Sequence, residues 1–362
     1  SLNNKEVIPL SYSEEERTTT MSDTLGASVM VKVNEAGQPV RTENALGATQ
    51  QFIYNGAGDS VRAIDPLGNS YQIEYDDQHN PTSIINPSGY TTIISYEDQF
   101  NKVDSVTDDR GNALAFSYDT KGNLAGITYP DSHSETLVYD EDGNVIRKTT
   151  RKGDIINYQY NSRGQLTRVD YPDGTYLSYT YDSSGNMLTA SNQAGTISFE
   201  YNTRNQPVRI LYPDGNSFNY THNDAGFLTE RIEKDGYTTI YSYDDAGNLI
   251  RVSDGTGSVI VSYTYDAAGK LIRKAVRNGA YTIYEYDLSG RLNKLKNYNK
   301  NDEILSRFEY QYDISGYPLI LDVSEGRFQY DYDAIGQLIK VIYPDGHITQ
   351  FSYDSAGNRC SM

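Results

Sequence analysis

The 362-residue chain is long enough for two or three globular domains, yet 34 of its residues are Tyr, 30 are Gly and none is Trp. Its formal net charge of -18 at pH 7 argues against non-specific binding to nucleic acid or to an anionic membrane surface, because both need clustered Lys and Arg. No apolar stretch approaches the roughly 20 residues of a membrane-spanning helix, so membrane insertion is not expected either.

Cysteine usage and the N-terminal region bear on location. The single Cys360 excludes an internal disulfide framework and has no partner cysteine for a zinc or redox motif. Residues 1–30 lack the basic segment followed by an apolar one that marks a secretory signal. We therefore expect no targeting signal in this chain.

The chain begins with a segment, residues 1–32, that we predict to be a degenerate first repeat or an N-terminal cap. Tyr12 lies 21 residues before Val33, and Asp23-Thr24-Leu25-Gly26 has the phase of the later Asp65-Pro66-Leu67-Gly68. Residues 33–362 are predicted to be a repeat array that stops within a repeat at the C-terminus. A fixed period of this length is typical of repeat architectures.

The repeat is marked by a Tyr-Asp-x-x-Gly motif that recurs at steps of 20 to 22 residues, apart from one step of 26. With Val33 as a sixteenth copy, the motif begins at Tyr54, Tyr75, Tyr96, Tyr118, Tyr139, Tyr160, Tyr181, Tyr201, His222, Tyr243, Tyr265, Tyr286, Tyr312, Tyr332 and Tyr353. Nine copies carry the full motif, namely those at Tyr118, Tyr139, Tyr181, Tyr243, Tyr265, Tyr286, Tyr312, Tyr332 and Tyr353.

Each repeat is predicted to be two short antiparallel strands. The residue two before the motif start is always aromatic or aliphatic, as Tyr179 is before Tyr181, and such alternation places both side chains on one face of a strand. After the motif Gly, Leu166 and Val169 indicate a second strand, which ends at the turn Tyr171-Pro172-Asp173-Gly174.

Three copies replace the motif Gly. Asn205 and His79 stand at that position, and both residue types tolerate a positive φ better than most. Phe100 does not fit, so the turn after Tyr96 is expected to have another shape or to be strained. In the repeat with the 26-residue step, residues 297–303 are predicted to form a lengthened hairpin loop.

Tandem hairpins predict an all-β fold in which a long antiparallel sheet curves or spirals. Sixteen repeats of two strands would extend about 150 Å at about 4.8 Å per strand, and strand twist makes so long a sheet coil around a hollow. We expect the aromatic face to pack by stacking each ring on the rings of adjacent repeats.

The motif Asp is predicted to be a turn residue whose carboxylate caps backbone N–H groups, since Asn replaces it at positions 34, 55, 161, 202 and 223 without disturbing the period. The predicted structural residues are Tyr118, Asp119, Gly122, Tyr139, Asp140, Gly143, Tyr181, Asp182, Gly185, Tyr243, Asp244, Gly247, Tyr265, Asp266, Gly269, Tyr286, Asp287, Gly290, Tyr332, Asp333, Gly336, Tyr353, Asp354 and Gly357.

No catalytic, cofactor-binding or metal-binding residue is predicted. The four histidines, His79, His133, His222 and His347, lie at turn or motif positions without metal-ligand spacing. The sequence has no calcium loop, nucleophile elbow or phosphate-binding loop, and Cys360 has no partnered base.

The tandem pattern Tyr-x-Tyr-Asp-x-x-Gly-Asn/Arg/Gln-Leu, between about residues 33 and 358, resembles the YD-repeat or Rhs-repeat family. That family includes bacterial Rhs polymorphic toxins, wall-associated proteins, the C component of insecticidal toxin complexes and the teneurins. The resemblance implies a β-strand spiral that forms a cocoon, in the toxins around a C-terminal effector domain, and a secreted or cell-surface location. The Asp-Pro-x-Gly self-cleavage signature of the toxins is matched only by Asp65-Pro66-Leu67-Gly68, which lies early and in phase as an ordinary turn.

Three functions remain open at this point. The first is a non-catalytic shell segment that encloses or scaffolds an effector, whose partner is the rest of its own longer polypeptide, with cap and effector domains beyond this chain. An acidic wall would then suit a cationic cargo. The second is an adhesion or carbohydrate-binding module that uses its tyrosines on a glycan or another cell-surface ligand. The third, an enzyme, lacks an off-period cluster of acids or bases.

Overall fold

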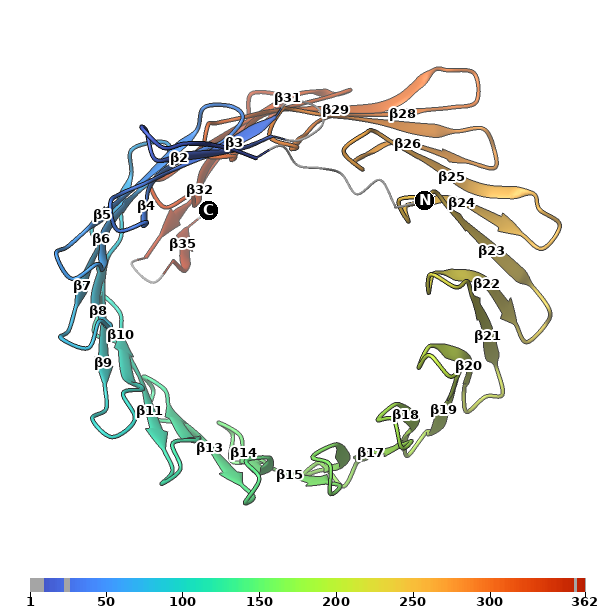
Figure 1. Cartoon of the computed structure of the whole chain (residues 1–362), viewed down its shortest axis with the longest axis horizontal. Coiled ribbons are helices and arrows are strands. Elements are labelled where there is room, and N and C mark those ends of the chain that lie inside the picture. The colour runs from blue at the N-terminus through green and yellow to red at the C-terminus, as the bar shows by residue number, and fades with distance from the viewer. Residues whose placement is uncertain (1–9, 23–26, 355–356, 362) are drawn as a thin grey trace. The chain divides into compact units, whose positions relative to one another are not determined.

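The computed structural model describes residues 10–22, 27–354 and 357–361, and every helix or strand in that part of the chain is a β-strand (Figure 1). The first seventeen are β1 (Leu10–Ser13), β2 (Thr18–Ser22), β3 (Ser28–Val33), β4 (Pro39–Glu43), β5 (Thr49–Tyr54), β6 (Ser60–Ile64), β7 (Ser70–Tyr75), β8 (Pro81–Ile85), β9 (Thr91–Tyr96), β10 (Val103–Thr107), β11 (Ala113–Tyr118), β12 (Leu124–Thr128), β13 (Ser134–Tyr139), β14 (Val145–Thr149), β15 (Ile155–Tyr160), β16 (Leu166–Asp170) and β17 (Tyr176–Tyr181).

The remaining strands are β18 (Met187–Asn192), β19 (Gly195–Tyr201), β20 (Pro207–Leu211), β21 (Ser217–His222), β22 (Leu228–Glu233), β23 (Thr238–Tyr243), β24 (Leu249–Asp254), β25 (Val259–Tyr265), β26 (Leu271–Val276), β27 (Tyr281–Tyr286), β28 (Leu292–Tyr298), β29 (Ile304–Tyr312), β30 (Pro318–Val323), β31 (Gly326–Tyr332), β32 (Leu338–Ile342), β33 (Ile348–Gln350), β34 (Ser352–Tyr353) and β35 (Arg359–Ser361).

Strands pair antiparallel with their neighbours in sequence, as the alternation predicted. In the hairpin of β13 and β14, Leu137 pairs with Lys148 and Tyr139 pairs with Val145, so the two motif-face residues of β13 share a face with these partners. A β-bulge between Val138 and Tyr139 precedes the turn. The same irregularity falls before Tyr160, Tyr181 and the other motif tyrosines, as the ladders of their hairpins show.

Most turns at the two ends of the hairpins share one backbone geometry, whereas tighter turns join β18 to β19 and β30 to β31. In the motif turn, Asp182 N–H donates to Asn186 C=O at 2.9 Å and Gly185 N–H to Asp182 C=O at 3.2 Å. The fourth residue has a positive φ, 94° at Gly185, which an L side chain rarely adopts. His79 and Asn205 occupy this position with φ of 66° and 59°, so the prediction that they adopt positive φ is confirmed.

Phe100 escapes strain because its turn is one residue longer. Glu97 N–H donates to Lys102 C=O, five residues on rather than four, and the positive φ of 54° falls on Asn101. The 22-residue step from Tyr96 to Tyr118 accommodates the extra residue. Of the two sequence-based alternatives, a turn of another shape is therefore the one observed.

The prediction of a lengthened loop at residues 297–303 is wrong. Asn299 N–H donates to Glu303 C=O at 3.0 Å, which is the ordinary turn, and the extra residues lengthen β28 and β29 instead. Tyr298 continues the alternation beyond the usual end of the second strand and stacks on Tyr281 with ring centroids 4.7 Å apart. Added strand pairing and ring contact explain why these polar residues extend the hairpin rather than loop out.

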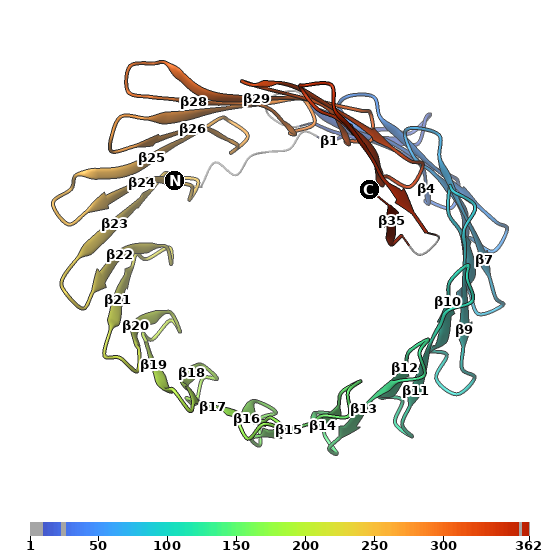
Figure 2. The ribbon, with the colours of Figure 1, turned by 180° about the vertical axis from the view of Figure 1, so that it is seen from behind.

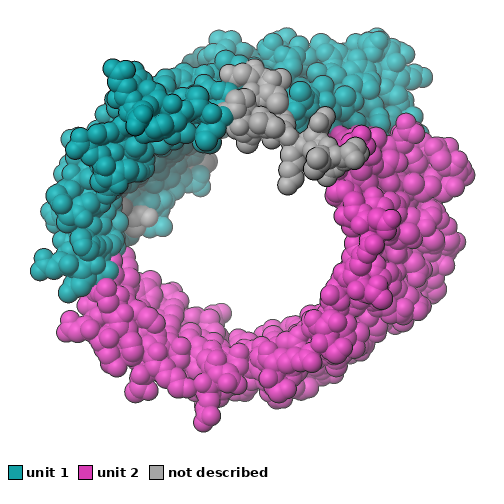
Figure 3. Space-filling view, in the orientation of Figure 1, with its two compact units in different colours: residues 1–94, 107–111, 261–362 teal, residues 95–106, 112–260 magenta. Residues whose placement is uncertain are grey.

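By its internal contacts the chain divides into two compact units. Unit 1 comprises residues 1–94, 107–111 and 261–362, and unit 2 comprises residues 95–106 and 112–260. Within unit 2, successive hairpins lie side by side along an arc, whose concave side is visible in the magenta surface of Figure 3. The prediction of an all-β chain whose tandem hairpins build a curved antiparallel sheet is confirmed.

In unit 1, the N-terminal strands, drawn in blue, lie beside β29 to β32, drawn in orange and red, as both views of the ribbon show (Figures 1 and 2). A cavity of about 350 Å³ is lined from one side by Thr42 and Ala48 and from the other by Ile314 and Tyr317. Arg110 Nη1 lies 2.9 Å from the Asp354 carboxylate, across 244 residues of sequence. Asp23-Thr24-Leu25-Gly26, whose phase suggested a decayed repeat, lies outside the described residues.

The sheet has almost no conventional core. Among the described residues the buried apolar side chains are Ala48, Val169, Val323 and Val341, and no large side chain is fully buried. Most strand residues on the motif face are half-buried. Stability must therefore come from many partly buried side chains and from polar contacts between repeats.

Candidate functional site

The motif tyrosines form a hydrogen-bonded series across the repeats. In most repeats the hydroxyl donates to the backbone carbonyl of the residue that begins the second strand of the preceding hairpin, as Tyr139 does to Leu124 at 2.9 Å. Eleven such bonds of 2.6 to 3.0 Å are made by Tyr54, Tyr75, Tyr118, Tyr139, Tyr160, Tyr181, Tyr201, Tyr286, Tyr312, Tyr332 and Tyr353.

These bonds hold the strands where backbone pairing stops. The ladder between β12 and β13 runs from Thr128 and Ser134 only as far as Gly126 and Thr136. Beyond it, Tyr139 reaches back to Leu124 with its hydroxyl while its ring covers the motif face. A phenol suits this position because it combines an apolar ring with a polar tip. Burial accordingly raises the pKa of Tyr139, Tyr160 and Tyr181.

The motif carboxylates cap their own turns. Asp182 Oδ1 accepts the backbone N–H groups of Ser184 at 2.8 Å and Asn186 at 2.9 Å, and Oδ2 accepts the Asn186 side-chain amide at 2.9 Å. The amide of that Asn is the main cause that holds the pKa of Asp182 below its usual range. Asn161 makes equivalent backbone contacts through its own Oδ1, which explains why Asn can replace the motif Asp.

The residue that follows the motif Gly links one repeat to the next, a role the sequence reasoning did not assign. Gln38, Gln165 and Gln206 donate their side-chain amides to the carbonyl of the next turn's Gly at 2.8 to 3.2 Å. In five other repeats the side chain at this position covers the next motif tyrosine. The pairs are Lys102 with Tyr118, Phe227 with Tyr243, Lys270 with Tyr286, Arg291 with Tyr312 and Tyr317 with Tyr332.

This arrangement corrects the prediction that motif rings stack on the motif rings of adjacent repeats. Among the described residues, the stacked contacts of Tyr243 and Tyr332 are with Phe227 and Tyr317, which follow a motif Gly. The centroid separations are 4.9 and 5.0 Å. Equivalent rings of adjacent repeats are two strands apart, about 9.6 Å at about 4.8 Å per strand, which is too far for direct stacking. The recurring Asn, Arg or Gln after Gly was visible in the motif and could have indicated this contact.

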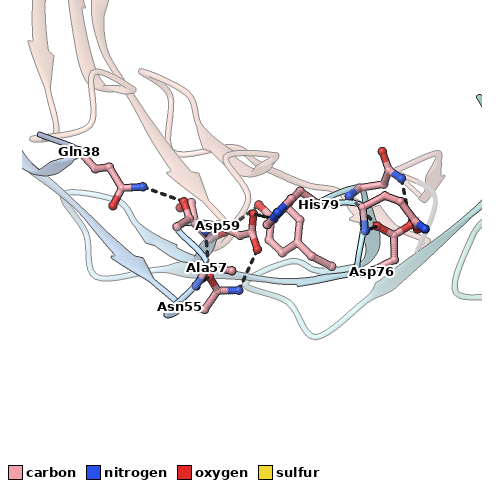
Figure 4. Close-up of polar contacts among 11 residues, drawn as sticks. Gln38, Asn55, Ala57, Asp59, Asp76 and His79 are labelled. Carbon is pink, nitrogen blue, oxygen red and sulfur yellow. Dashed lines mark hydrogen bonds and ion pairs between the residues drawn. The ribbon is translucent and has the colours of Figure 1, made fainter. Parts of the chain in front are cut away.

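Figure 4 shows three consecutive turns joined in this way. Gln38 donates to the Gly58 carbonyl, and Asn55 donates its amide to Asp59 at 2.9 Å. His79, at the positive-φ position of the next turn, places Nδ1 2.8 Å from Asp59 Oδ1. The Asn55 amide, with a further contribution from His79, lowers the pKa of Asp59. Side chains at the motif turns therefore bind neighbouring turns rather than a common centre.

Two motif positions, Val33 and His222, lack the tyrosine hydroxyl. His222 replaces Tyr at the end of β21, and its buried Nδ1 has no hydrogen-bond partner among the described residues. We expect His222→Tyr to stabilise the chain by about 1 kcal/mol, because the new hydroxyl could reach the Pro207 carbonyl, the equivalent of Leu124 for Tyr139. Thermal unfolding followed by circular dichroism tests this. His222→Phe, which lacks the hydroxyl, is the matched control, and equal gains from both variants would contradict the explanation.

The other candidate reactive residues are not brought together. His133 lies 3.3 Å from Asp131 within its own turn, and His347 packs beside the ring of Tyr343. Cys360 is exposed and donates weakly to the Asn358 carbonyl. Within residues 10–22, 27–354 and 357–361, no group of three or more His, Cys, Asp or Glu side chains could hold a metal ion. In the same ranges no helix is long and apolar enough to cross a membrane.

The teneurin YD-shell profile matches residues 1–171, 136–226 and 258–362, and the RHS repeat profile matches residues 222–259. The chain belongs to the teneurin YD-shell family. This membership confirms the resemblance seen in the motifs and classes the chain with shell-type repeat proteins, a group that is generally structural. Among curated proteins, no sequence matches the chain.

Solved structures share the YD-shell fold at low sequence identity. A crystal structure of TcdB2-TccC3-TEV has a TM-score of 0.69 and 16% identity, over 99% of this chain and 24% of the other. A crystal structure of TcdB2-TccC3 has a TM-score of 0.70 and 16% identity, over 99% of this chain and 25% of the other. This YD-shell chain therefore spans about a quarter of the length of those proteins.

Proposed function

We propose that this chain is a non-catalytic wall segment of a shell that encloses or scaffolds an effector domain for delivery. The observation that carries the proposal is the repeated Tyr hydroxyl bond, as from Tyr139 to Leu124, which joins eleven of the hairpins to the one before. Such a series stabilises an extended wall without a central core. In line with membership of the YD-shell family, the wall would act outside the cell or at its surface.

By the same proposal, the motif Tyr, Asp and Gly residues are structural residues of the wall, and residues 33–362 form the array. Residues 1–32 are proposed to be a degenerate first repeat or cap, since β1 and β2 form a hairpin in which Tyr12 pairs with Thr19. The proposed partner is the rest of a longer polypeptide. This is supported by the two solved structures, in which the matched part is about a quarter of the chain.

The alternative of a glycan-binding surface module has weaker support. It would need tyrosine hydroxyls and ring faces open to solvent. The hydroxyls of eleven motif tyrosines instead donate to backbone carbonyls, as Tyr181 does to Leu166 at 2.7 Å. Rings such as Tyr243 and Tyr332 are covered by the side chain that follows the preceding motif Gly.

Limited proteolysis of the complete natural polypeptide tests the enclosure. We expect one fragment outside the wall sequence to resist protease while the wall is intact. That fragment should be digested at least tenfold faster when Tyr139→Ala and Tyr181→Ala weaken two parts of the wall. Ser183→Ala, an exposed turn residue, is the control and should leave protection unchanged. If every fragment outside the wall sequence is digested at the same rate in all variants, the proposal is overturned.

A further inference from the structure

Unit 2 contains a cleft of about 570 Å³ at the hairpin edge opposite the motif turns. It lies between the turn that joins β20 to β21 and the turn that joins β22 to β23. Its lining includes two aromatic rings, Tyr212 and Phe218, and three carboxylates, Asp214, Glu233 and Asp235. The volume is in the range of pockets that take small ligands or a peptide side chain with its flanking backbone.

Two residues that line the cleft already bind a guanidinium group of this chain. The Arg231 guanidinium lies over the Phe218 ring, 5.2 Å from its centroid, and donates to the Glu233 carboxylate at 2.7 Å. Tyr212 meets Phe218 edge to face, with centroids 6.0 Å apart and an interplanar angle of 85°. A ring beside a carboxylate is the combination that attracts a flat cation.

This combination recurs elsewhere in the array. In unit 2, Arg168 lies over Tyr176 at 4.5 Å and pairs with Asp170 at 2.8 Å. Also in unit 2, Arg151 lies over Tyr129 at 4.4 Å and pairs with Asp131. Aromatic and acidic side chains of the repeats therefore bind arginine side chains of the same chain. The cleft differs because it has further carboxylates besides the one that pairs with Arg231.

Asp214 and Asp235 are those carboxylates. Asp214 accepts the Asn216 backbone N–H at 2.9 Å and side-chain amide at 2.7 Å, and Asp235 accepts the Tyr237 N–H at 3.0 Å. Their own turns thus hold both in place. Neither forms an ion pair with a Lys, Arg or His side chain of the described residues. Among the described residues that line the cleft, Lys234 is the one with a cationic side chain, so the lining is net acidic.

We propose that this cleft binds the guanidinium or ammonium group of an arginine or lysine side chain carried by a peptide segment. Tyr212 and Phe218 supply aromatic surface for the cation, and the two carboxylates supply charge-assisted acceptors. A metal ion fits less well, because no group of three ligating side chains forms among the described residues and aromatic rings line the cleft. The site does not depend on enclosure of an effector, so either proposal can fail without the other.

Peptide titration of the whole chain tests the site. The probes are capped peptides of equal length that carry arginine, lysine, glutamine or glutamate. Their binding is measured by fluorescence anisotropy at about 150 mM salt, which screens general attraction to the acidic chain. We expect the arginine and lysine peptides to bind and the other two to bind at least tenfold more weakly. The double variant Asp214→Asn with Asp235→Asn should lose about tenfold in affinity. Asn has the shape of Asp, and its side-chain oxygen can still accept the backbone N–H groups of the two turns.

The matched control is Asp142→Asn with Asp245→Asn, which removes the same charge from two exposed motif turns in unit 2. It should change the affinity less than about twofold. Phe218→Leu, which keeps an apolar side chain but removes the ring, should weaken binding several-fold. Equal losses in the two double variants would overturn the proposal, since only general charge attraction would remain. Tighter binding of a neutral oligosaccharide than of the arginine peptide would overturn it as well.

Discussion

Tyr181→Ala is expected to cost about 3 kcal/mol of stability, the larger part from lost ring burial and the rest from the lost hydroxyl bond. Tyr181 lies in the middle of the array, and its hydroxyl donates to the Leu166 carbonyl at 2.7 Å. Tyr181→Phe keeps the ring and removes only the hydrogen bond, so it should cost about 1 kcal/mol. Urea unfolding gives the total effect.

Hydrogen exchange gives the local effect of the same variants, which matters because a repeat array need not unfold in a single step. The amides of β16 and β17 should exchange faster in Tyr181→Ala, while those of distant hairpins change less. Ser183→Ala is the control in the adjoining exposed turn and should stay within about 0.5 kcal/mol of the unaltered chain. Equal costs for Tyr181→Ala and Ser183→Ala would show that the motif face has been assigned wrongly.

Alkaline pH is expected to destabilise the chain above pH ~10, the ordinary pKa of a phenol. Burial raises the pKa of Tyr75, Tyr118, Tyr139, Tyr160, Tyr181, Tyr201, Tyr220, Tyr243, Tyr286, Tyr312, Tyr330 and Tyr332. The folded chain therefore keeps these protons to a higher pH than the unfolded chain does. This contribution to stability is complete below the unfolded pKa and is lost as pH rises through the folded pKa.

The alkaline loss should be steep because many phenols titrate together, and the unfolding temperature should fall by several degrees per pH unit. A phenolate also cannot donate to the carbonyl that its hydroxyl held. Thermal unfolding from pH 7 to about 11, with ultraviolet absorbance of phenolate as a second readout, measures this. The triple variant Tyr139→Phe, Tyr160→Phe and Tyr181→Phe should reduce the slope. Tyr237→Phe, at a side chain that is 46% exposed, is the control and should leave the slope unchanged. A slope that is equal in all of them would contradict the explanation.

The repeat and its hairpins could be predicted from the sequence because their causes are local. The alternation of Tyr179 and Tyr181 assigns a strand face within three residues, and the turn chemistry of residues 182–186 closes the hairpin. The positive φ of His79 and Asn205 followed from the same local reasoning. The lengthened β28 and β29 did not, because polar side chains such as those of Asn297 and Asn299 suit a loop unless a neighbouring strand pairs with them.

Contacts between repeats were decided only by the tertiary structure. The motif showed an Asn, Arg or Gln after Gly, yet its placement over the next repeat's tyrosine or carbonyl depends on how closely hairpins approach. The Arg110 and Asp354 pair and the cleft beside Phe218 depend in addition on how the sheet curves. Each strand pair adds a small twist, and side chains far apart in sequence meet only after many such twists accumulate. By itself, the sequence determined the strands, turns and period, whose physical causes act over a few residues. The tertiary structure decided which side chains meet, because that depends on summed geometry that no single repeat encodes.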